Sequence, residues 1–390
     1  MINKLTLSNF KAFASAEVPI RPYTLLSGLN SSGKSSVLQA LGLLRQGQSS
    51  LSDAPSRAGL PLNGEIVELG IGQDVLNEDY RGAAGEEAEI GFRLEAEEGR
   101  FFECRVRYGR EDDYLPLSYI APEIGTSESW EEGNLSLFKP GFQYLTANRI
   151  IPAVTYPRSE EMSVRRRFLG TRGEYTVDFL RSHLDEPVPP GPLRYKDTSP
   201  RLLDQTQAWM GEICPGVRIE AAVIERTDLV RLGFQFATPD HPVSRPRRPT
   251  NVGFGLTYVL PVIVACLTAR PGAMILIENP EAHVHPQGQS VMAHLTCAAA
   301  SMGAQLIVET HSDHILNGVR LAVKREVLPA KDVALHYFKR EDDGIGIVSP
   351  EIRKDGMLSE WPAGFFDEWD RSLDQLLDLR LTPRSERCTS

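Results

Sequence analysis

A run of eight residues near the start of the chain has the residue types and spacing that hold a triphosphate. Gly28-Leu29-Asn30-Ser31-Ser32-Gly33-Lys34-Ser35 satisfies every fixed position of the pattern G-x-x-x-x-G-K-[ST]. In such a loop, backbone N–H groups at a helix N-terminus bind phosphate oxygens, and glycine permits their close approach. The predicted phosphate-binding residues are Gly28, Asn30, Ser31, Ser32, Gly33, Lys34, Ser35 and Ser36.

Two of these side chains predict the cofactors. Lys34 is expected to bridge the β- and γ-phosphates, and the Ser35 hydroxyl is expected to bind Mg²⁺. ATP and Mg²⁺ are therefore the expected cofactors. The competing interpretation is a loop rich in glycine and serine that contains this run by chance.

The elements around the loop favour the first interpretation. Residues 23–26 predict a short buried strand, and residues 36–44 place apolar side chains at helical spacing. A strand before the loop and a helix after it form the context that a true phosphate-binding loop requires. Residues 45–64, rich in Ser, Gly, Gln and Pro, predict only a connection.

Composition limits the remaining choices. The chain has 390 residues and a formal net charge of −10, which argues against a generally basic protein that coats nucleic acid. Its five cysteines include no C-x-x-C pair, so neither a disulfide framework nor a zinc ribbon is indicated. No leader and no apolar run of membrane-spanning length is recognised. A cytoplasmic protein without a membrane segment is expected.

The opening of the chain carries a family resemblance. Residues 2–20 alternate as strand, turn and strand, and the phosphate loop with Asn30 and Ser32 follows closely. This arrangement resembles the ATPase heads of the SMC/RecF group. The segments 144–149, 170–175 and 209–216, taken together, resemble bacterial ATPases of antiphage defence loci, the Septu/PtuA-like ATPases.

The resemblance covers roughly residues 1–379 and implies an α/β fold, a P-loop NTPase with an ABC-type ATPase head, an antiparallel β-lobe and an inserted helical arm. The expected parts are residues 1–110 with the P-loop and β-lobe, 111–249 as the arm, and 250–390 with the rest of the head. A hairpin is expected over 88–108 and an amphipathic helix over 368–379. After His311 no Toprim nuclease of the kind that OLD-type proteins carry is recognised.

Residues 273–281 match the second half of such a nucleotide site. A buried strand over 273–277 ends at Glu278, which is expected to coordinate Mg²⁺, through water. The resemblance places Asn279 where the catalytic glutamate usually stands, and an amide cannot act as a general base. Either Glu281 takes that role, or hydrolysis is slow and the ATP-bound state is long-lived. Slow hydrolysis is the preferred reading.

Three further site assignments follow from the order of the motifs. Asn251, Gly253 and Gly255, before an apolar helix, stand where the signature motif would cap the γ-phosphate of the opposite subunit; a plain helix N-cap is the alternative. His311, at the end of the next buried strand, corresponds to the switch histidine. Gln73 is the candidate for the glutamine that touches Mg²⁺, although a solvated glutamine would look the same.

Two basic clusters could contact a phosphate backbone, although solvated surface charge is the commoner explanation. They contain Arg165, Arg166 and Arg167, and Arg245, Arg247 and Arg248.

The predicted function is an ATP-dependent switch that forms a homodimer, or a higher even-numbered oligomer, around ATP. It would regulate a partner effector such as a nuclease encoded nearby, in antiphage defence. The alternative is a RecF-like DNA-binding ATPase of repair. A transporter subunit and a small-molecule kinase are disfavoured.

Overall fold

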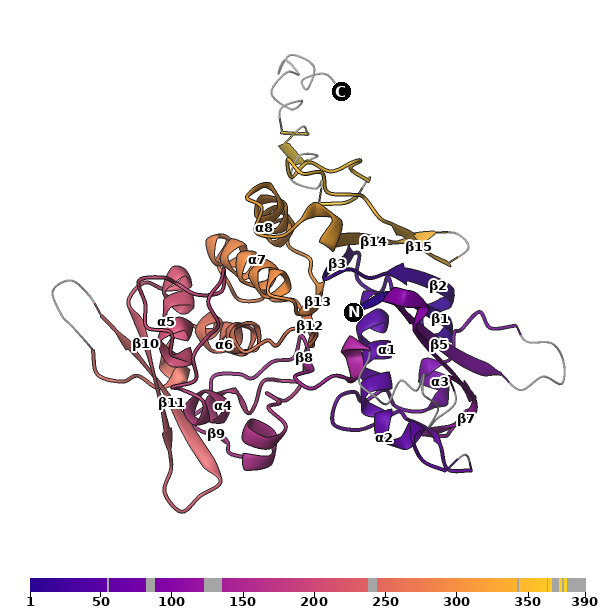
Figure 1. The fold of residues 1–390 in the computed structure, drawn as a ribbon, viewed down its shortest axis with the longest axis horizontal. Coiled ribbons are helices and arrows are strands. Elements are labelled where there is room, and N and C mark those ends of the chain that lie inside the picture. Colours follow the sequence, from indigo (N-terminus) through magenta and orange to yellow (C-terminus); the bar gives the residue numbers. More distant parts are fainter. Residues whose placement is uncertain are drawn as a thin grey trace, which may run out of the picture.

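A six-stranded sheet forms the centre of the molecule, with the strand order β15-β14-β3-β13-β12-β8 (Figure 1). The computed structural model describes residues 1–54, 56–81, 88–122, 135–237, 244–341, 344–362, 364–366, 372–373 and 375–376. The parallel strands are β3 (Tyr23–Gly28), β8 (Gln143–Leu145), β12 (Met274–Glu278), β13 (Gln305–Glu309) and β14 (Val333–Glu341); β15 (Gly344–Val348) is antiparallel. The carboxyl ends of β3, β13 and β12 therefore meet at one edge of the sheet.

A second six-stranded sheet, entirely antiparallel in its pairing, is built from the N-terminal part of the chain in the order β2-β1-β5-β6-β7-β4. Its strands are β1 (Ile2–Phe10), β2 (Phe13–Pro19), β4 (Gly59–Pro61), β5 (Glu89–Ala96), β6 (Phe101–Arg107) and β7 (Tyr114–Ala121). The helices of this part are α1 (Lys34–Gln46), α2 (Gln48–Leu51) and α3 (Gly72–Val75). Helix α1 contacts β3, β13 and β4, so it joins the two sheets.

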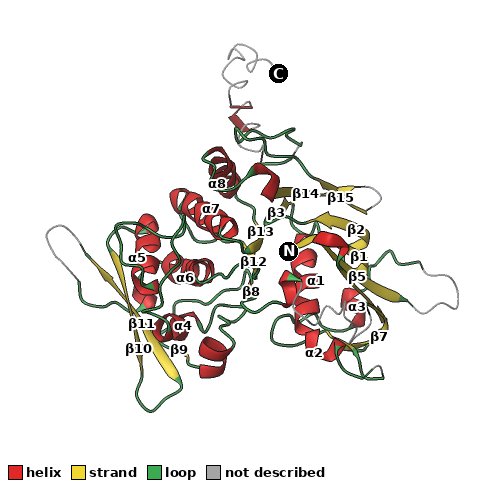
Figure 2. Ribbon diagram, viewed as in Figure 1, coloured by secondary structure: helices red, strands yellow, loops and turns green. Residues whose placement is uncertain are grey.

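A third, smaller sheet lies at the opposite end of the molecule, on the left in Figures 1 and 2. It contains β9 (Tyr156–Pro157), β10 (Val217–Val223) and β11 (Leu229–Phe236). Helices α4 (Thr176–Ser182) and α5 (Leu202–Ile213) pack against this sheet. Between this sheet and the centre lie α6 (Phe254–Leu267) and α7 (Pro286–Ser301), and α8 (Asp313–Lys324) packs against α7 (Figure 2). Single turns are η1 (Glu97–Gly99), η3 (Ser136–Phe138), η4 (Glu161–Arg165), η5 (Pro249–Asn251) and η6 (Ala330–Asp332).

The central strands are buried on both faces, which explains their nearly continuous apolar sequences. Because successive side chains of a strand point to opposite faces, one strand supplies two cores. In β12, Ile275 and Ile277 join the core that contains α6, α7 and α8. Met274 and Leu276 join the core that contains α1 and the N-terminal sheet. The central sheet is thus held rigidly from both sides.

Most predicted elements are present, and one expectation needs correction. The hairpin over 88–108 is β5 and β6, and the predicted strands before Glu278 and His311 are β12 and β13. Residues 45–64 are more than a connection, because they contain α2 and the strand β4, which pairs with β7. The helix expected over 368–379 falls for the most part outside the described residues. Among the described residues, no helix has both the length and the apolarity to cross a bilayer.

The parts over 1–110, 111–249 and 250–390 remain a proposal for the domain organisation. Strand pairing connects the middle part to the other two. Strand β7 extends the N-terminal sheet, and β8 pairs with β12 at the edge of the central sheet. Residues expected in an inserted arm therefore reach the carboxyl edge of the sheet where the nucleotide site is expected.

Candidate nucleotide site

The loop between β3 and α1 has a backbone that requires glycine at two positions. Gly28 has φ 141°, and a Cβ atom there would lie 2.2 Å from the carbonyl oxygen of Phe338. Gly33 has φ 89° and is the residue before α1, so the free N–H groups of the first helical turn follow it directly. The close approach expected from the sequence is therefore required by packing as well as by ligand binding.

The loop lines an open cavity of about 1140 Å³, which is large enough for a nucleoside triphosphate and a metal ion. Of the predicted site residues, the cavity brings together Asn30, Ser31, Ser32, Gly33, Lys34, Ser35, Ser36, Gln73, Asn279 and His311. Lys11, Gln39, Glu309 and Arg340 also line it. These residues come from both sheets and from α1 and α3, so the cavity lies where the two halves of the chain meet.

Lys34 and Ser35 are both hydrogen-bonded in the absence of a ligand. Lys34 is buried and donates from Nζ to the carbonyl oxygens of Gly28 at 3.1 Å and Leu29 at 2.6 Å. Burial lowers the pKa of Lys34, whereas the charge of Glu309 raises it. The Ser35 hydroxyl donates to the carboxylate of Glu309, with Oγ 2.9 Å from Oε2 and 3.1 Å from Oε1.

Glu309 is a carboxylate that the sequence reasoning did not single out. It ends β13 and is only 5% exposed, and its Oε1 lies 3.9 Å from Lys34 Nζ. Burial raises the pKa of Glu309 to about 7, and the neighbouring charge of Glu278 adds to this rise. The hydrogen bond from Ser35 and the charge of Lys34 oppose it. The signal available in the sequence was a glutamate at the end of a buried strand, just before the candidate switch histidine.

Glu278, the residue predicted to coordinate Mg²⁺, is held by a different set of contacts. The Tyr144 hydroxyl donates to Oε1 at 2.6 Å, and the Ala147 N–H donates to Oε2 at 2.8 Å. Both carboxylate oxygens of Glu278 are therefore hydrogen-bonded to β8 and the residues that follow it. Its role as a metal ligand stays a prediction.

Asn279 and Glu281 occupy different positions relative to the cavity. Asn279 lines it, has φ 44°, and its buried Oδ1 accepts no hydrogen bond from the described residues. Glu281 accepts the backbone N–H of His311 at 2.8 Å through Oε1, and burial raises the pKa of its carboxyl group. Glu281 thus fixes the backbone of the candidate switch histidine, while Asn279 faces the space where a nucleotide would lie.

His311 is exposed at the cavity, and its side chain is free to meet a ligand that enters. Burial of part of the ring lowers the pKa of His311, and the charge of Lys34 lowers it further. A neutral imidazole donates one hydrogen bond through one nitrogen and accepts one at the other, which suits contact with a phosphate and a water molecule. The role of switch histidine remains a prediction.

A buried arginine at the end of the segment 144–149 joins this region to α6, a role that the sequence analysis did not assign to it. Arg149 is 1% exposed and donates from Nη1 to the carbonyl of Glu278 at 2.7 Å and from Nη2 to that of Asn279 at 2.5 Å. Its guanidinium carbon lies 4.1 Å from the ring centroid of Tyr258, whose hydroxyl donates to the carbonyl of Ala147. Burial lowers the pKa of Arg149 to about 10, which leaves it charged at neutral pH.

The candidate signature residues lie at the start of α6 and do not line the cavity. Gly253 is exposed and immediately precedes the helix, and Asn251 ends η5. A Cβ atom on Gly255 would lie 2.5 Å from the carbonyl oxygen of His283, so glycine lets α6 pack against the loop after Glu281. The exposed N-terminus of this helix has N–H groups available for an anion, as the prediction requires.

Gln73 lies in the short helix α3 at the edge of the cavity and is exposed. Its Oε1 accepts a hydrogen bond from Arg110 at 3.5 Å, at the limit of hydrogen-bond length. The same helix presents Asp74 to the cavity. Gln73 is thus in reach of a bound ligand, and its contact with Mg²⁺ stays a prediction.

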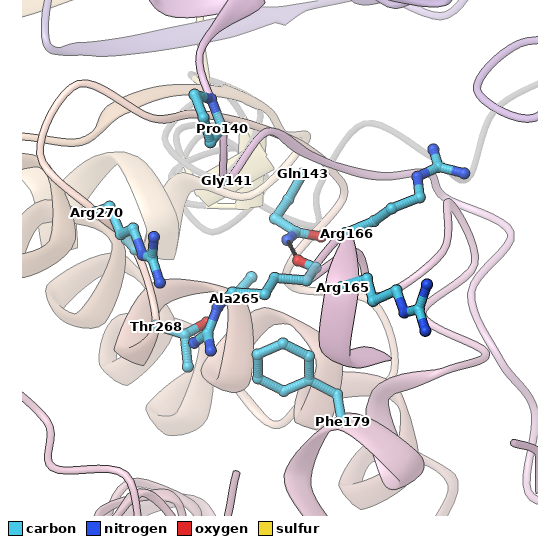
Figure 3. Close-up of a pocket in the computed structure, with 11 residues that line it drawn as sticks. Pro140, Gly141, Gln143, Arg165, Arg166, Phe179, Ala265, Thr268 and Arg270 are labelled. Carbon is cyan, nitrogen blue, oxygen red and sulfur yellow. Dashed lines mark hydrogen bonds between the residues drawn. The ribbon is translucent and has the colours of Figure 1, made fainter. Parts of the chain in front are cut away.

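The first basic cluster is largely neutralised by carboxylates. Arg166 pairs with Glu65 at 2.6 Å, and Arg167 forms a bidentate pair with Glu186 at 3.0 Å. Arg165 is exposed and lies 3.6 Å from the carboxylate of Glu160. Figure 3 shows the arginines around a pocket that Arg270 also lines, with the Arg165 side chain pointing away from it.

The second basic cluster is more open. Arg245, Arg247 and Arg248 are all exposed, beside β11. The Arg247 guanidinium carbon lies 5.7 Å from the ring centroid of Phe236. If either cluster binds a phosphate backbone, this one has the more accessible charge.

Three family models match parts of the chain. They are described as "AAA ATPase domain" over residues 1–97, "AAA domain, putative AbiEii toxin, Type IV TA system" over 217–317, and "Protein of unknown function (DUF3696)" over 328–376. The first contains the P-loop, and the second contains the candidate signature, Glu278 and His311. A curated relative, the OLD nuclease of Thermus scotoductus, is 23% identical over 380 residues. The match covers 88% of this chain and 65% of that protein.

Solved structures of SMC heads share the fold. One is an SMC head bound to the C-winged helix domain of ScpA, with a TM-score of 0.52, 15% identity, and coverage of 90% of this chain and 98% of that one. Another is an SMC head with an extended coiled coil bound to the C-terminal domain of ScpA derived from Pyrococcus furiosus, with a TM-score of 0.50 and 14% identity. It covers 97% of this chain and 99% of that one.

The two AAA models, the OLD nuclease match and the fold shared with SMC heads together support an ATPase head like those of the SMC/RecF/OLD group. The predicted fold class, an α/β P-loop NTPase with an ABC-type head, is confirmed. In this head the P-loop strand β3 is next to β13, and β12 lies one strand further away. The order places the carboxylates of two neighbouring strands at the edge where the P-loop begins.

Proposed function

We propose that this protein is an ATP-binding and slowly hydrolysing switch, which dimerises around ATP and thereby regulates a partner effector. The observation that carries the proposal is the cavity in which Lys34, Ser35, Asn279 and His311 come together from separate parts of the chain. The residues present fit Mg²⁺, because the Ser35 hydroxyl already contacts a buried carboxylate at the cavity wall. Bound Mg²⁺ would neutralise phosphate charge there.

Dimerisation is proposed from the position of the candidate signature. Gly253 is exposed and does not line the cavity that holds the P-loop, so it is free to meet a nucleotide on a second copy. In a twofold dimer of this kind each nucleotide would be bound by Lys34 of one subunit and the turn at Gly253 of the other. ATP binding would then change the assembly, and hydrolysis would release it.

Slow hydrolysis is proposed from the groups that face the cavity. Asn279 faces the nucleotide space with an amide, and Glu281 is engaged with the backbone of His311. An amide cannot accept a proton from the attacking water, and general-base catalysis contributes about 10²–10⁴-fold to the rate of such reactions. A long-lived ATP-bound state suits a switch better than a motor.

Control of an effector in antiphage defence is the broadest part of the proposal. Solved heads of this fold bind a domain of a second protein, ScpA, and a curated relative is named a nuclease. A nuclease is therefore the first kind of partner to test. The open cluster at Arg245, Arg247 and Arg248 supports a second candidate, a RecF-like DNA-binding ATPase. That candidate predicts ATP-dependent duplex binding by the protein alone, strongly weakened by salt.

The test is the mass of the protein in solution with and without ATP and Mg²⁺. The wild type is expected to double its mass with ATP, and Lys34→Ala, which removes the phosphate-binding ammonium, is expected to stay monomeric. Arg165→Ala, at an exposed position outside the cavity, serves as the matched control and is expected to dimerise. A wild-type mass that does not respond to ATP would contradict the proposal.

A further inference from the structure

The carboxylate nearest the Ser35 hydroxyl is that of Glu309 rather than that of Glu278. Ser35 Oγ lies 2.9 Å from Glu309 Oε2 and 3.1 Å from Oε1. Glu309 also lines the nucleotide cavity, whereas Glu278 has both oxygens hydrogen-bonded to Tyr144 and Ala147. The two glutamates stand at the ends of neighbouring strands, yet they have different hydrogen-bond partners.

The sheet explains this difference. Glu278 and Glu309 are in register on the parallel strands β12 and β13, and Glu309 is also in register with Leu26 of β3. Since neighbouring strands are about 4.8 Å apart, Glu309 begins one strand step from the P-loop strand and Glu278 begins two. A glutamate on β13 therefore reaches the hydroxyl at the start of α1 directly.

The negative charge of Glu309 is incompletely compensated. Its carboxylate is 6% exposed, and the nearest cation, Lys34 Nζ, lies 3.9 Å away and donates to two carbonyl oxygens of its own loop. The neighbouring carboxylates of Glu278 and Glu281 add further negative charge near Glu309. A buried carboxylate in such surroundings favours a divalent cation as its counterion.

We propose that Glu309, together with Ser35, holds the Mg²⁺ that accompanies ATP, and that Glu278 is a framework residue. This inference rests on the proposed nucleotide function. It reassigns the metal carboxylate from the end of β12 to the end of β13. Glu278 then serves to position the residues after β8 through its bonds with Tyr144 and Ala147.

The test compares two matched substitutions, Glu309→Gln and Glu278→Gln, which remove one charge each at registered positions. The affinity for a fluorescent ATP analogue is measured with EDTA and with Mn²⁺, and the spectrum of bound Mn²⁺ is recorded by electron paramagnetic resonance. The expected result is that Glu309→Gln loses about tenfold or more of the gain in affinity that Mn²⁺ gives, as removal of a metal-site residue does. In EDTA its affinity is expected to be no lower than that of the wild type, because the carboxylate removed has the same sign of charge as the phosphates.

Glu278→Gln is expected to keep most of the gain from Mn²⁺, because Glu278 is hydrogen-bonded to Tyr144 and Ala147 and not to the proposed metal-binding side chains. Equal loss in both variants, or loss confined to Glu278→Gln, would overturn the proposal. Glu309→Asp, which keeps the charge, is expected to retain part of the gain and the resonance signal of bound Mn²⁺. A gain unchanged in both Glu309 variants would also overturn it. If the wild type binds no nucleotide, the proposed function fails instead.

Discussion

Substitution of Asn279 is the most direct test of the proposed slow ATP hydrolysis. Its φ of 44° is stabilised by the hydrogen bond from its own N–H to the carbonyl of Glu309 at 2.8 Å. Asn279 lines the cavity at the place where the resemblance expects a general base. Asn279→Glu is expected to raise ATP turnover by about tenfold or more, within the range that a general base supplies.

The measurement is single-turnover ATP hydrolysis, and Asn279→Gln is the control, because it adds the same length without a basic group. Loss of the remaining hydrolysis in Glu281→Gln, with no gain in Asn279→Glu, would assign the base to Glu281 instead. Glu281→Gln keeps an oxygen that can accept the N–H of His311 at the position seen for Oε1. The two variants therefore separate a chemical role from a structural one.

At the residue scale, site residues that belong to one sequence motif could be predicted, whereas contacts between residues far apart in the chain could not. Gly33 and Lys34 could be recognised because their spacing along the chain is fixed by one loop. Tyr144 and Arg149 could not, since they reach Glu278 across about 130 residues of chain and follow a strand of only three residues. Short strands without turn signals give too little periodicity to detect.

The connection between β8, β12 and α6 is the element-scale feature with the clearest energetic consequence. Arg149 satisfies two carbonyl groups at the end of β12 and packs on Tyr258 of α6. Arg149→Met would leave both carbonyls without this partner, so we expect a loss of about 2–4 kcal/mol in the free energy of unfolding. Urea unfolding checks this value.

The exposed Arg165→Met is the control for this change, and it is expected to stay within about 0.5 kcal/mol of wild type. Arg149→Lys keeps the charge but cannot serve both carbonyls in the same planar geometry. It should fall between wild type and Arg149→Met. A urea midpoint equal to that of wild type in both Arg149 variants would show that the contacts of Arg149 do not stabilise the fold.

His336 connects β14 to the N-terminal sheet and predicts a dependence of stability on pH. It is buried, with Nε2 2.6 Å from the carbonyl oxygen of Pro19 and Nδ1 2.7 Å from Ser349 Oγ. Burial lowers the pKa of His336 below its usual value near 6.5, although the bond to Pro19 opposes this. The neutral ring satisfies both partners by donating at Nε2 and accepting at Nδ1.

A histidine whose pKa is lower in the folded state binds its proton more readily in the unfolded state. Its contribution is therefore complete above about pH 6.5, and it falls by about 1 kcal/mol per pH unit below that value until the folded pKa is reached. Melting temperatures between pH 5 and pH 8 should drop more steeply on the acid side for wild type than for His336→Gln. Parallel curves for the two proteins would contradict the assignment.

At the element scale the long, strongly patterned segments were predictable. Helix α1 and the hairpin β5–β6 lie at the predicted ranges, because helical spacing or alternation persists over many residues. Helix α2 and strand β4 were missed, since each is four residues or fewer and depends on tertiary contacts with α1 and β7. The placement of β8 in the central sheet is likewise a tertiary effect.

The whole molecule makes the proposed dimer testable through complementation. In a twofold sandwich, Lys34→Ala damages one half of each site and Gly253→Asp damages the other half, by placing a carboxylate near the γ-phosphate. Each variant alone should be inactive. An equal mixture should recover about a quarter of the wild-type turnover, because half of the dimers are mixed and each has one intact site.

The control is a mixture of Lys34→Ala with Ser35→Ala, which damages the same half twice and should recover nothing. Recovery in neither mixture, with both single variants soluble and folded, would argue that Gly253 does not act across a subunit boundary. Recovery depends on subunit exchange, so the variants are mixed without nucleotide and ATP is added afterwards.

The P-loop gives the Lys34 ammonium two carbonyl acceptors of its own, at Gly28 and Leu29. A phosphate bound by this ammonium must therefore compete with these two bonds. The enthalpy of nucleotide binding is therefore less favourable than the number of contacts in the nucleotide-bound state would suggest. When the nucleotide product leaves, the Lys34 ammonium can bond the carbonyl oxygens of its own loop again, and this favours product release.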